Sequence, residues 1–320
     1  MCTVPGIRAQ AETEVTMEYV LTTSALQKKY GSFTALHDIS MHVPKGAIYG
    51  FVGKNGAGKT TLIRLICGLQ TPTRGEYSLF GIPFSEPEII KSRKRMGAVV
   101  ETPSIYLDMT AEDNLKEQYR ILGLPSFDSV PQLLKLVGLE DTGKKKVKNF
   151  SLGMRQRLGI AVALAGNPDF LVLDEPANGL DPQGIIEIRE LLLKLNREHG
   201  ITLLISSHIL DELSRLATHY GFIDRGEMLK EISAKELEAS CRKCLCVTVS
   251  DTRSLCTALE PRGIEYRVLS DDQAEIYGSL EITELVELLS QNGCVLIKIR
   301  EREEGLENYF MNLIGGKNDE

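Results

Sequence analysis

The sequence predicts an α/β fold followed by a small α+β domain, and three observations lead to this prediction. The apolar residues 47–52 precede a glycine-rich loop, and an apolar helical pattern follows that loop. Residues 170–173 form a second short apolar run, which ends in two acidic residues. After about residue 231 the pattern changes to the order β-α-β-β-α-β, which is typical of a ferredoxin-like unit.

The composition is that of a globular protein with room for two domains. The chain has 320 residues, of which 42% are hydrophobic and 25% are charged. Nowhere are eighteen apolar residues consecutive, so we expect a cytoplasmic chain with neither a membrane span nor a secretory leader. The net charge of −7 argues against a broad electrostatic surface for nucleic acid. Residues 1–16 lack apolar periodicity and are predicted to be a disordered tail.

The seven cysteines are predicted to be reduced thiols, because their number is odd and nothing indicates secretion. Cys241 and Cys244, with Cys246 nearby, have the spacing of half a zinc site. No second pair of this kind follows, so further ligands would have to come from the isolated Cys256 and Cys294. The sequence therefore favours free thiols over a metal at this segment.

The glycine-rich loop has the complete pattern G-x-x-x-x-G-K-[ST] between a strand and a helix. Glycines allow backbone N–H groups to turn toward a polyphosphate, and the following helix offers its free N–H groups to the same anion. Lys59 is predicted to reach the β- and γ-phosphates, and the Thr60 hydroxyl is predicted to bind Mg²⁺. The nucleotide-binding residues predicted in this loop are Gly53, Asn55, Gly56, Ala57, Gly58, Lys59, Thr60 and Thr61.

Two acidic residues follow the buried strand 170–173, at the end that faces the ligand in an open parallel sheet. Asp174 is predicted to hold Mg²⁺, and Glu175 to orient and deprotonate the attacking water. His208 follows a further apolar strand, residues 201–206, and so lies beside the same crevice. It could hydrogen-bond a γ-phosphate, although a histidine in such a position is more often a capping residue.

The other elements of the first domain follow from local patterns. Strand-like patterns predict strands at residues 19–24, 34–43 and 75–80, and a short apolar run predicts another at residues 97–100. Helical spacing predicts a helix capped by Thr110 and further helices at residues 130–137, 152–165 and 183–199. Residues 101–166 are thus expected to form a largely helical subdomain. Tyr30 is expected in the turn 28–32, where it could stack on a nucleotide base or be a half-buried turn residue.

Residues 150–157, Phe-Ser-Leu-Gly-Met-Arg-Gln-Arg, resemble the signature motif of ATP-binding cassette (ABC) ATPases. The resemblance implies that Ser151 and Gly153 approach the γ-phosphate bound by a second copy of the cassette. Leu152 and Met154 replace the glycine and glutamine that are usual in this family.

The other parts of the family pattern occur in order between residues 18 and 231. The resemblance implies that Tyr30 stacks on adenine, that Asp181 belongs to the loop that crosses between the two subunits, and that His208 is the switch histidine. Glu101 follows the strand 97–100, where most members have glutamine. Its carboxylate could bind Mg²⁺ beside the nucleotide and couple the site to a membrane subunit, or it could be a solvated acid at a strand end.

Glu101 and the Ser-Leu-Gly-Met sequence together resemble the branch of bacterial exporters that handles bacitracin, lantibiotics and related peptide antibiotics. The resemblance implies an ATPase subunit that is peripheral on the inner face of the membrane. It would close as a dimer, expected to be a homodimer, on two Mg·ATP and drive a separate permease. The expected domains are 17–231 for the P-loop ATPase and 232–320 for the small α+β unit.

The alternative is a soluble ABC ATPase that is not coupled to transport. Such proteins usually carry a long heptad insertion or two cassettes in one chain, and neither feature occurs in this sequence.

Overall fold

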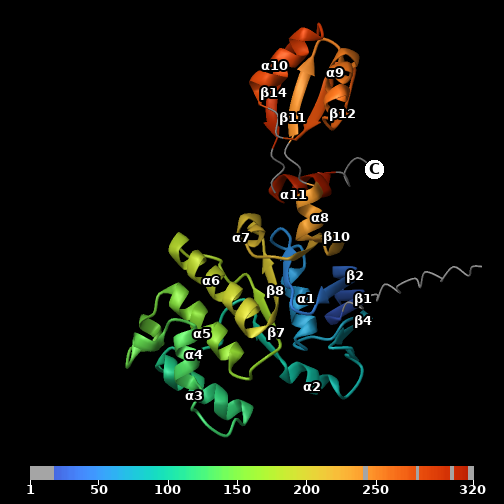
Figure 1. Cartoon of the computed structure of the whole chain (residues 1–320). Helices are drawn as coiled ribbons and strands as arrows, with labels where there is room; N and C mark the ends of the chain where they lie inside the picture. The colour runs from blue at the N-terminus through green and yellow to red at the C-terminus, as the bar shows by residue number, and fades with distance from the viewer. Residues whose placement is uncertain (1–17, 241–243, 279–280, 303–305, 316–320) are drawn as a thin grey trace, which may run out of the picture.

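The computed structural model describes residues 18–240, 244–278, 281–302 and 306–315, which form three sheets and their surrounding helices (Figure 1). Two of the sheets belong to the first domain, and the third belongs to the C-terminal unit. The predicted tail, residues 1–16, lies outside the described residues, as does Cys241.

The central sheet of the first domain has the strand order β10-β9-β3-β8-β7-β6. Neighbouring strands are parallel, except that β10 runs antiparallel to β9. Its strands are β3 (Ile48–Val52), β6 (Met96–Val99), β7 (Phe170–Asp174), β8 (Thr202–Ser207), β9 (His219–Asp224) and β10 (Glu227–Ser233). Because β3, β8 and β7 are adjacent and parallel, their carboxyl ends meet at one edge of the sheet.

A second, antiparallel sheet has the order β2-β1-β4-β5. Its strands are β1 (Tyr19–Tyr30), β2 (Phe33–Pro44), β4 (Arg74–Leu79) and β5 (Ile82–Pro83). The expectation that Tyr30 lies in a loop was wrong, because β1 continues to Tyr30 and pairs it with Phe33. The hairpin turns within two residues, at Gly31, whose φ is 60°, and Ser32.

The central sheet is buried on both faces, and β7 shows how. Phe170 and Val172 belong to an apolar cluster with helix α1 (Lys59–Ile66) and the second sheet. Leu171 and Leu173 point to the opposite face and join the larger cluster, to which the helical subdomain contributes. This two-sided burial explains why β7 is a continuous apolar run rather than an alternating one.

The predicted helical subdomain is confirmed between β6 and β7. Its helices are α3 (Ala111–Leu122), α4 (Val130–Leu136) and α5 (Leu152–Leu164). Thr110 caps α3 as expected, since its hydroxyl accepts from the Asp113 N–H at 3.1 Å. The remaining helices of the first domain are α2 (Ile89–Lys94), α6 (Pro182–His199) and α7 (Leu210–Ser214).

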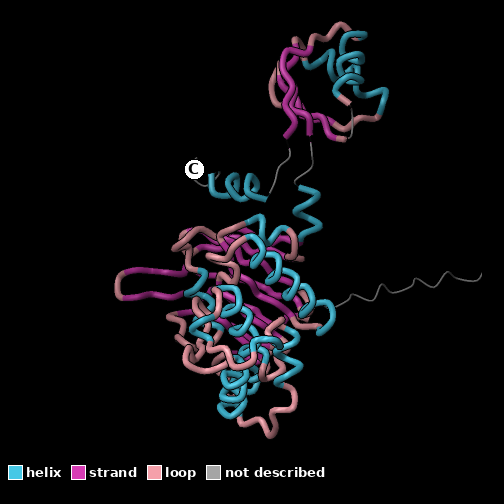
Figure 2. The backbone as a smooth tube through the Cα atoms, turned by 90° about the vertical axis from the view of Figure 1, so that its left-hand side faces the viewer, coloured by secondary structure: helices cyan, strands magenta, loops and turns pink. Residues whose placement is uncertain are grey.

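The C-terminal unit has the predicted element order, with its sheet in the order β12-β13-β11-β14. Its elements are β11 (Cys244–Val249), α9 (Thr252–Leu259), β12 (Tyr266–Val268), β13 (Gln273–Tyr277), α10 (Ile282–Gln291) and β14 (Leu296–Arg302). Figure 2 shows its strands on one side and its helices on the other. A separate apolar cluster joins the sheet to α9 and α10, so this unit has its own core.

The expected domain boundary needs two corrections. The boundary between residues 231 and 232 lies inside β10, which continues pairing with β9 to Ser233. Two helices beyond it, α8 (Ala234–Ser240) and α11 (Leu306–Gly315), supply Leu237 and Phe310 to the core of the first domain. The ring centroids of Phe310 and Phe222 on β9 are 5.7 Å apart. The chain therefore returns to the first domain after completing the small unit (Figure 1).

Candidate functional site

The glycine-rich loop connects β3 to α1 with a backbone that only glycine adopts easily. Gly56 and Gly58 have φ values of 81° and 108°, in the left-handed region. A Cβ on Gly53 would lie 2.6 Å from the carbonyl oxygen of Ile223, so no larger residue fits without movement there. The loop therefore leads directly into the N-terminus of α1, which begins at Lys59.

Lys59, the first residue of α1, is a buried cation at the centre of this loop. Its side chain is 5% exposed, and Nζ donates to the carbonyl oxygens of Gly53 at 2.6 Å and Lys54 at 3.2 Å. Nζ also lies 3.1 Å from Oε1 of Glu175. The loop carbonyl groups thus hold the ammonium group, which faces the carboxylate of Glu175 just after β7.

Two oxygen donors that suit Mg²⁺ lie together beside the loop. The Thr60 hydroxyl donates to Oδ2 of Asp174 at 2.7 Å. Asp174 is 1% exposed, and its Oδ1 accepts from the Ser206 hydroxyl at 2.5 Å. A hydroxyl and a carboxylate are the hard ligands that a magnesium ion takes from phosphate-loop proteins, so these residues fit that ion.

Ser206 was not predicted as part of the site. It lies opposite Asp174 in the β7–β8 register, and besides donating to Asp174 it accepts from the Glu175 N–H at 3.0 Å. One hydroxyl therefore fixes both acidic residues at the end of β7. A serine at the end of an otherwise apolar strand was the only sequence signal for this contact.

Glu175 connects the lysine to the histidine. Its Oε2 lies 2.6 Å from Nδ1 of His208, while Oε1 faces Lys59. Glu175 has a φ of 51°, which is unfavourable for a residue with a side chain. Strained backbone of this kind is held by its surroundings and is often found at functional sites.

A further acidic residue, Glu212 on α7, interacts electrostatically with Glu175 and His208. Its Oε1 is buried, with no hydrogen-bond partner among the described residues. Burial raises the pKa of Glu212 and the negative charge of Glu175 raises it further, while His208 acts in the opposite direction. No local pattern in the sequence indicates this electrostatic coupling between α7 and the end of β7.

Ser151 and Asp181, which the family resemblance assigns to the signature motif and the crossing loop, each cap a helix. Ser151 caps α5 by accepting from the Met154 N–H at 3.3 Å, and Asp181 caps α6 by accepting from the Gly184 N–H at 3.1 Å. A Cβ on Gly153 would have Leu180 as its nearest neighbour, at 3.8 Å. Among the described hydrogen bonds, none joins Ser151 or Gly153 to the phosphate loop.

Tyr30 and Glu101 lie at the periphery of the site. Tyr30 is 43% exposed, and its hydroxyl donates to Oε1 of Gln70. Glu101 has a φ of 61°, is 54% exposed, and accepts from Arg64 of α1 at 2.7 Å. The described contacts of Glu101 lead to Arg64 and not to Thr60 or Asp174.

The sequence is similar to those of known transport proteins. The ABC transporter family profile matches residues 36–178. The bacitracin transport ATP-binding protein BcrA of Bacillus licheniformis is 42% identical over 94% of this chain and 99% of its own length. The chain belongs to the ATP-binding proteins of ABC transporters. The lantibiotic transport ATP-binding protein SrtF of Streptococcus pyogenes is 42% identical to this ABC cassette over 67% of the chain and 90% of its own length.

The fold of the cassette agrees with solved ABC structures. A dimeric, post-hydrolysis structure of the cassette MJ0796 bound to ADP and Pi has a TM-score of 0.60 and 26% identity, covering 67% of this chain and 98% of its own. This ABC cassette is therefore an ATPase that uses ATP and Mg²⁺. Among its described helices, none combines the length and the apolar character that crossing a membrane requires.

Proposed function

We propose that this ABC cassette hydrolyses ATP to drive a separate membrane permease that exports a peptide antibiotic of the bacitracin or lantibiotic type. The observation that carries the proposal is the joining of Lys59, Glu175 and His208 in one chain of polar contacts at the ends of β3, β7 and β8. The full-length similarity to BcrA supports the substrate class. Export, rather than uptake, follows from that substrate class.

The reaction assigns one role to each residue at the loop. Lys59 and the loop amides would stabilise charge on the phosphates, and Thr60 with Asp174 would hold Mg²⁺. When bound there, Mg²⁺ would supply positive charge that offsets the charge of the phosphates. Glu175 would take the proton of the attacking water, because its carboxylate faces the same space as the lysine. His208 would hold Glu175 in orientation and respond to the γ-phosphate.

A second copy of the cassette completes each site in this proposal. The N-terminus of α5, with Ser151 and Gly153, would face the γ-phosphate bound by the partner copy, and Asp181 would lie at the crossing between them. Nothing in the described hydrogen bonds ties Ser151 to its own phosphate loop, which agrees with a role toward the partner. The exposed ring of Tyr30 would stack on adenine.

The permease would dock beside Glu101. Residues lining a groove of about 500 Å³ next to it include Arg64, Leu69 and Val100, and the side chains of Tyr106 and Leu107 are 51% and 46% exposed nearby in the chain. A surface that combines exposed apolar side chains with the charged Arg64 and Glu101 suits a short helix of a membrane protein. The cassette would thus be peripheral on the inner face of the cell membrane.

The test is functional reconstitution with a candidate membrane chain, sought in the reading frames next to the one that encodes this chain. Cells that express both chains should resist a peptide antibiotic better than cells in which Lys59→Ala replaces the wild type. The purified cassette should hydrolyse ATP, and the variant should not. Hydrolysis without resistance to any such peptide, and without co-purification of a membrane chain, would favour a soluble ABC ATPase instead.

A further inference from the structure

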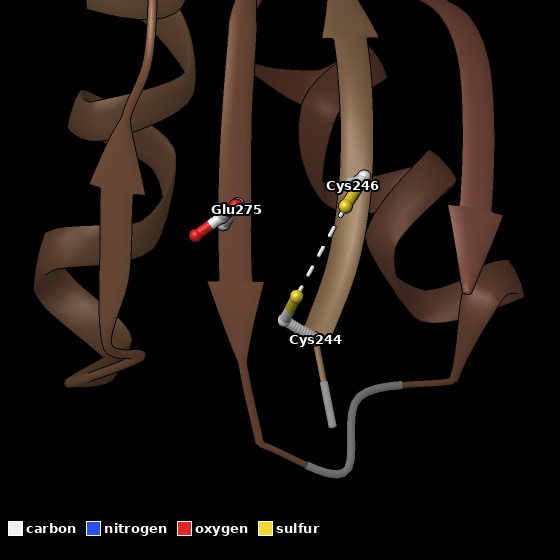
Figure 3. Close-up of side chains that lie close together, drawn as sticks. All are labelled: Cys244, Cys246 and Glu275. Atoms are coloured by element: carbon white, nitrogen blue, oxygen red, sulfur yellow. Dashed lines mark hydrogen bonds between the residues drawn. The ribbon is translucent and has the colours of Figure 1, made fainter. Parts of the chain in front are cut away.

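Two cysteines and a glutamate lie together on the small sheet, far along the chain from the nucleotide site. Cys244 and Cys246 are two residues apart on β11, so both point to the same face. Glu275 lies on β13 directly opposite Cys246. Figure 3 shows the Sγ atoms of Cys244 and Cys246 close together on β11, with Glu275 on the adjacent strand.

This face of the sheet is distinct from the apolar face. The alternating residues Leu245, Val247 and Val249 of β11 belong to the cluster that packs against α9 and α10. Cys244, Cys246 and Glu275 therefore point to the side that these helices do not cover. None of these three residues belongs to the apolar cluster of the unit.

The spacing of the donor atoms fits a tetrahedral metal ion. The two Sγ atoms are 4.0 Å apart, and all three ligand atoms lie within 4.8 Å of one another. A tetrahedral zinc ion with Zn–S bonds of about 2.3 Å holds two sulfurs about 3.8 Å apart. Both cysteines are reduced thiols, and their separation is about twice the S–S distance of about 2.05 Å in a disulfide.

The cluster is enclosed, which makes it more than a group of surface side chains. Cys244 and Glu275 are each 3% exposed, and Cys246 is half-buried. A carboxylate at this depth requires strong partners, since burial of unpaired charge is costly. The Tyr277 hydroxyl donates to Oε2 of Glu275 at 2.6 Å, and this hydrogen bond, followed by burial, raises the pKa of Tyr277 to about 12.

Two cationic residues lie on the strands beside the cluster. Arg267 of β12 lies opposite Glu275, and Arg300 of β14 lies opposite Cys246. Both arginines are exposed. The hydrogen bond from Tyr277 resembles the outer contacts that orient carboxylate ligands in zinc sites.

We propose that Cys244, Cys246 and Glu275 bind one zinc ion, with the fourth position open to water or an external ligand. Zinc accepts thiolate and carboxylate in one tetrahedral set, whereas Cu(I) prefers thiolates alone. Binding would release the thiol protons and join the first residue of β11 to β13. The ion would therefore stabilise the small unit by mass action, whether or not the cassette drives a peptide exporter.

The sequence indicated different ligands. It offered Cys256 and Cys294 as completing residues, but Cys294 belongs to the apolar cluster and donates to the Asp251 carbonyl oxygen at 3.5 Å. Cys256 lies on α9, which packs against the opposite, apolar face of the sheet. The third ligand comes instead from the pairing of β11 with β13, which brings Glu275 beside Cys246.

The test is metal binding by the full chain, prepared metal-free and fully reduced. Zinc is titrated in competition with a chromophoric chelator, and Co²⁺ is added separately as a probe whose absorption spectrum reports thiolate ligands. The wild type should bind one equivalent of zinc tightly. Cys246→Ser and Glu275→Gln should each weaken binding by more than about 100-fold, and Tyr277→Phe by about 10- to 100-fold, the usual effect of removing an outer contact.

Cys256→Ser is the matched control, because it removes a thiol from the same unit on the opposite side of the sheet. It should leave zinc affinity and the Co²⁺ spectrum unchanged, and circular dichroism with ATP binding should show that every variant is folded. The proposal is overturned if the folded, reduced wild type binds no stoichiometric zinc, or if Cys256→Ser weakens binding as much as Cys246→Ser. An unchanged affinity in Glu275→Gln would indicate a two-thiolate site and overturn the ligand set.

Discussion

The Nδ1 atom of His208 lies 2.6 Å from Oε2 of Glu175. The two residues follow adjacent parallel strands, β8 and β7, so the strand order of the central sheet brings them together. Glu175 also faces Lys59, at 3.1 Å, and thereby connects the phosphate loop to the short segment that leads into α7. The carboxylate of Glu175 thus contacts both the phosphate-loop lysine and the histidine that precedes α7.

Glu175→Gln should retain Mg·ATP binding and lose turnover by about 10²- to 10⁴-fold, because the amide keeps the shape of the side chain but cannot accept the proton of water. The protein should accumulate as an ATP-bound dimer, which size-exclusion chromatography with ATP detects. Lys59→Ala is the contrasting variant, since it should lose ATP binding itself. Near wild-type hydrolysis by Glu175→Gln would refute the role of Glu175.

Ser206→Ala should weaken Mg²⁺ binding in the presence of nucleotide by about 10- to 100-fold, because Asp174 loses the hydroxyl that orients it. Magnesium dependence of ATP hydrolysis measures the effect. Ser207→Ala is the matched control, since the Ser207 hydroxyl hydrogen-bonds only the backbone of Ile209 among the described residues. Equal effects of the two substitutions would contradict a specific role for Ser206.

Glu212→Gln should change the pH dependence of stability. The pKa of Glu212 is raised in the folded protein. Its protonated form therefore contributes fully to the free energy of unfolding below the ordinary pKa of about 4.3, and this contribution is lost as pH rises through the folded-state pKa. The variant should therefore gain thermal stability over the wild type at neutral pH and not at pH about 4. Thermal unfolding of both proteins across this range measures the difference, and a difference that does not vary with pH would exclude the mechanism.

Glu101→Gln and Glu101→Ala separate two roles for that residue. Glutamine can still accept from Arg64, so it should preserve both ATPase activity and transport. Alanine removes the contact with α1, and we expect ATPase activity to survive while transport with the permease falls. If alanine leaves both at the wild-type level, Glu101 is a solvated strand-end acid and has no part in coupling.

Phe310→Ala should destabilise the first domain by about 3 to 5 kcal/mol, because it removes a buried ring that packs against Phe222. Chemical denaturation followed by nucleotide-binding fluorescence reports that domain. Met311→Ala on the same helix is the control, since Met311 is 56% exposed and should change stability by less than about 0.5 kcal/mol. Equal stability of Phe310→Ala and the wild type would show that α11 is not part of this core.

The sequence by itself determined the features whose chemistry is local. The glycine pattern of residues 53–61 specifies a phosphate loop because the left-handed backbone and the close approaches there need glycine, and the hydroxyl and carboxylate caps at Thr110, Ser151 and Asp181 form within three residues along the chain. The acidic pair Asp174 and Glu175 was predicted because an apolar run of strand length shows where the strand ends.

Tertiary structure alone decided the contacts between residues far apart in the chain. The pairing of β7 with β8 places Ser206 against Asp174, and the pairing of β11 with β13 places Glu275 beside Cys246. Phe310, which follows the small unit in the chain, likewise joins the core of the first domain through packing that its own segment does not specify. Strand register and helix packing are set by the sum of many apolar contacts, so no short stretch of sequence contains them.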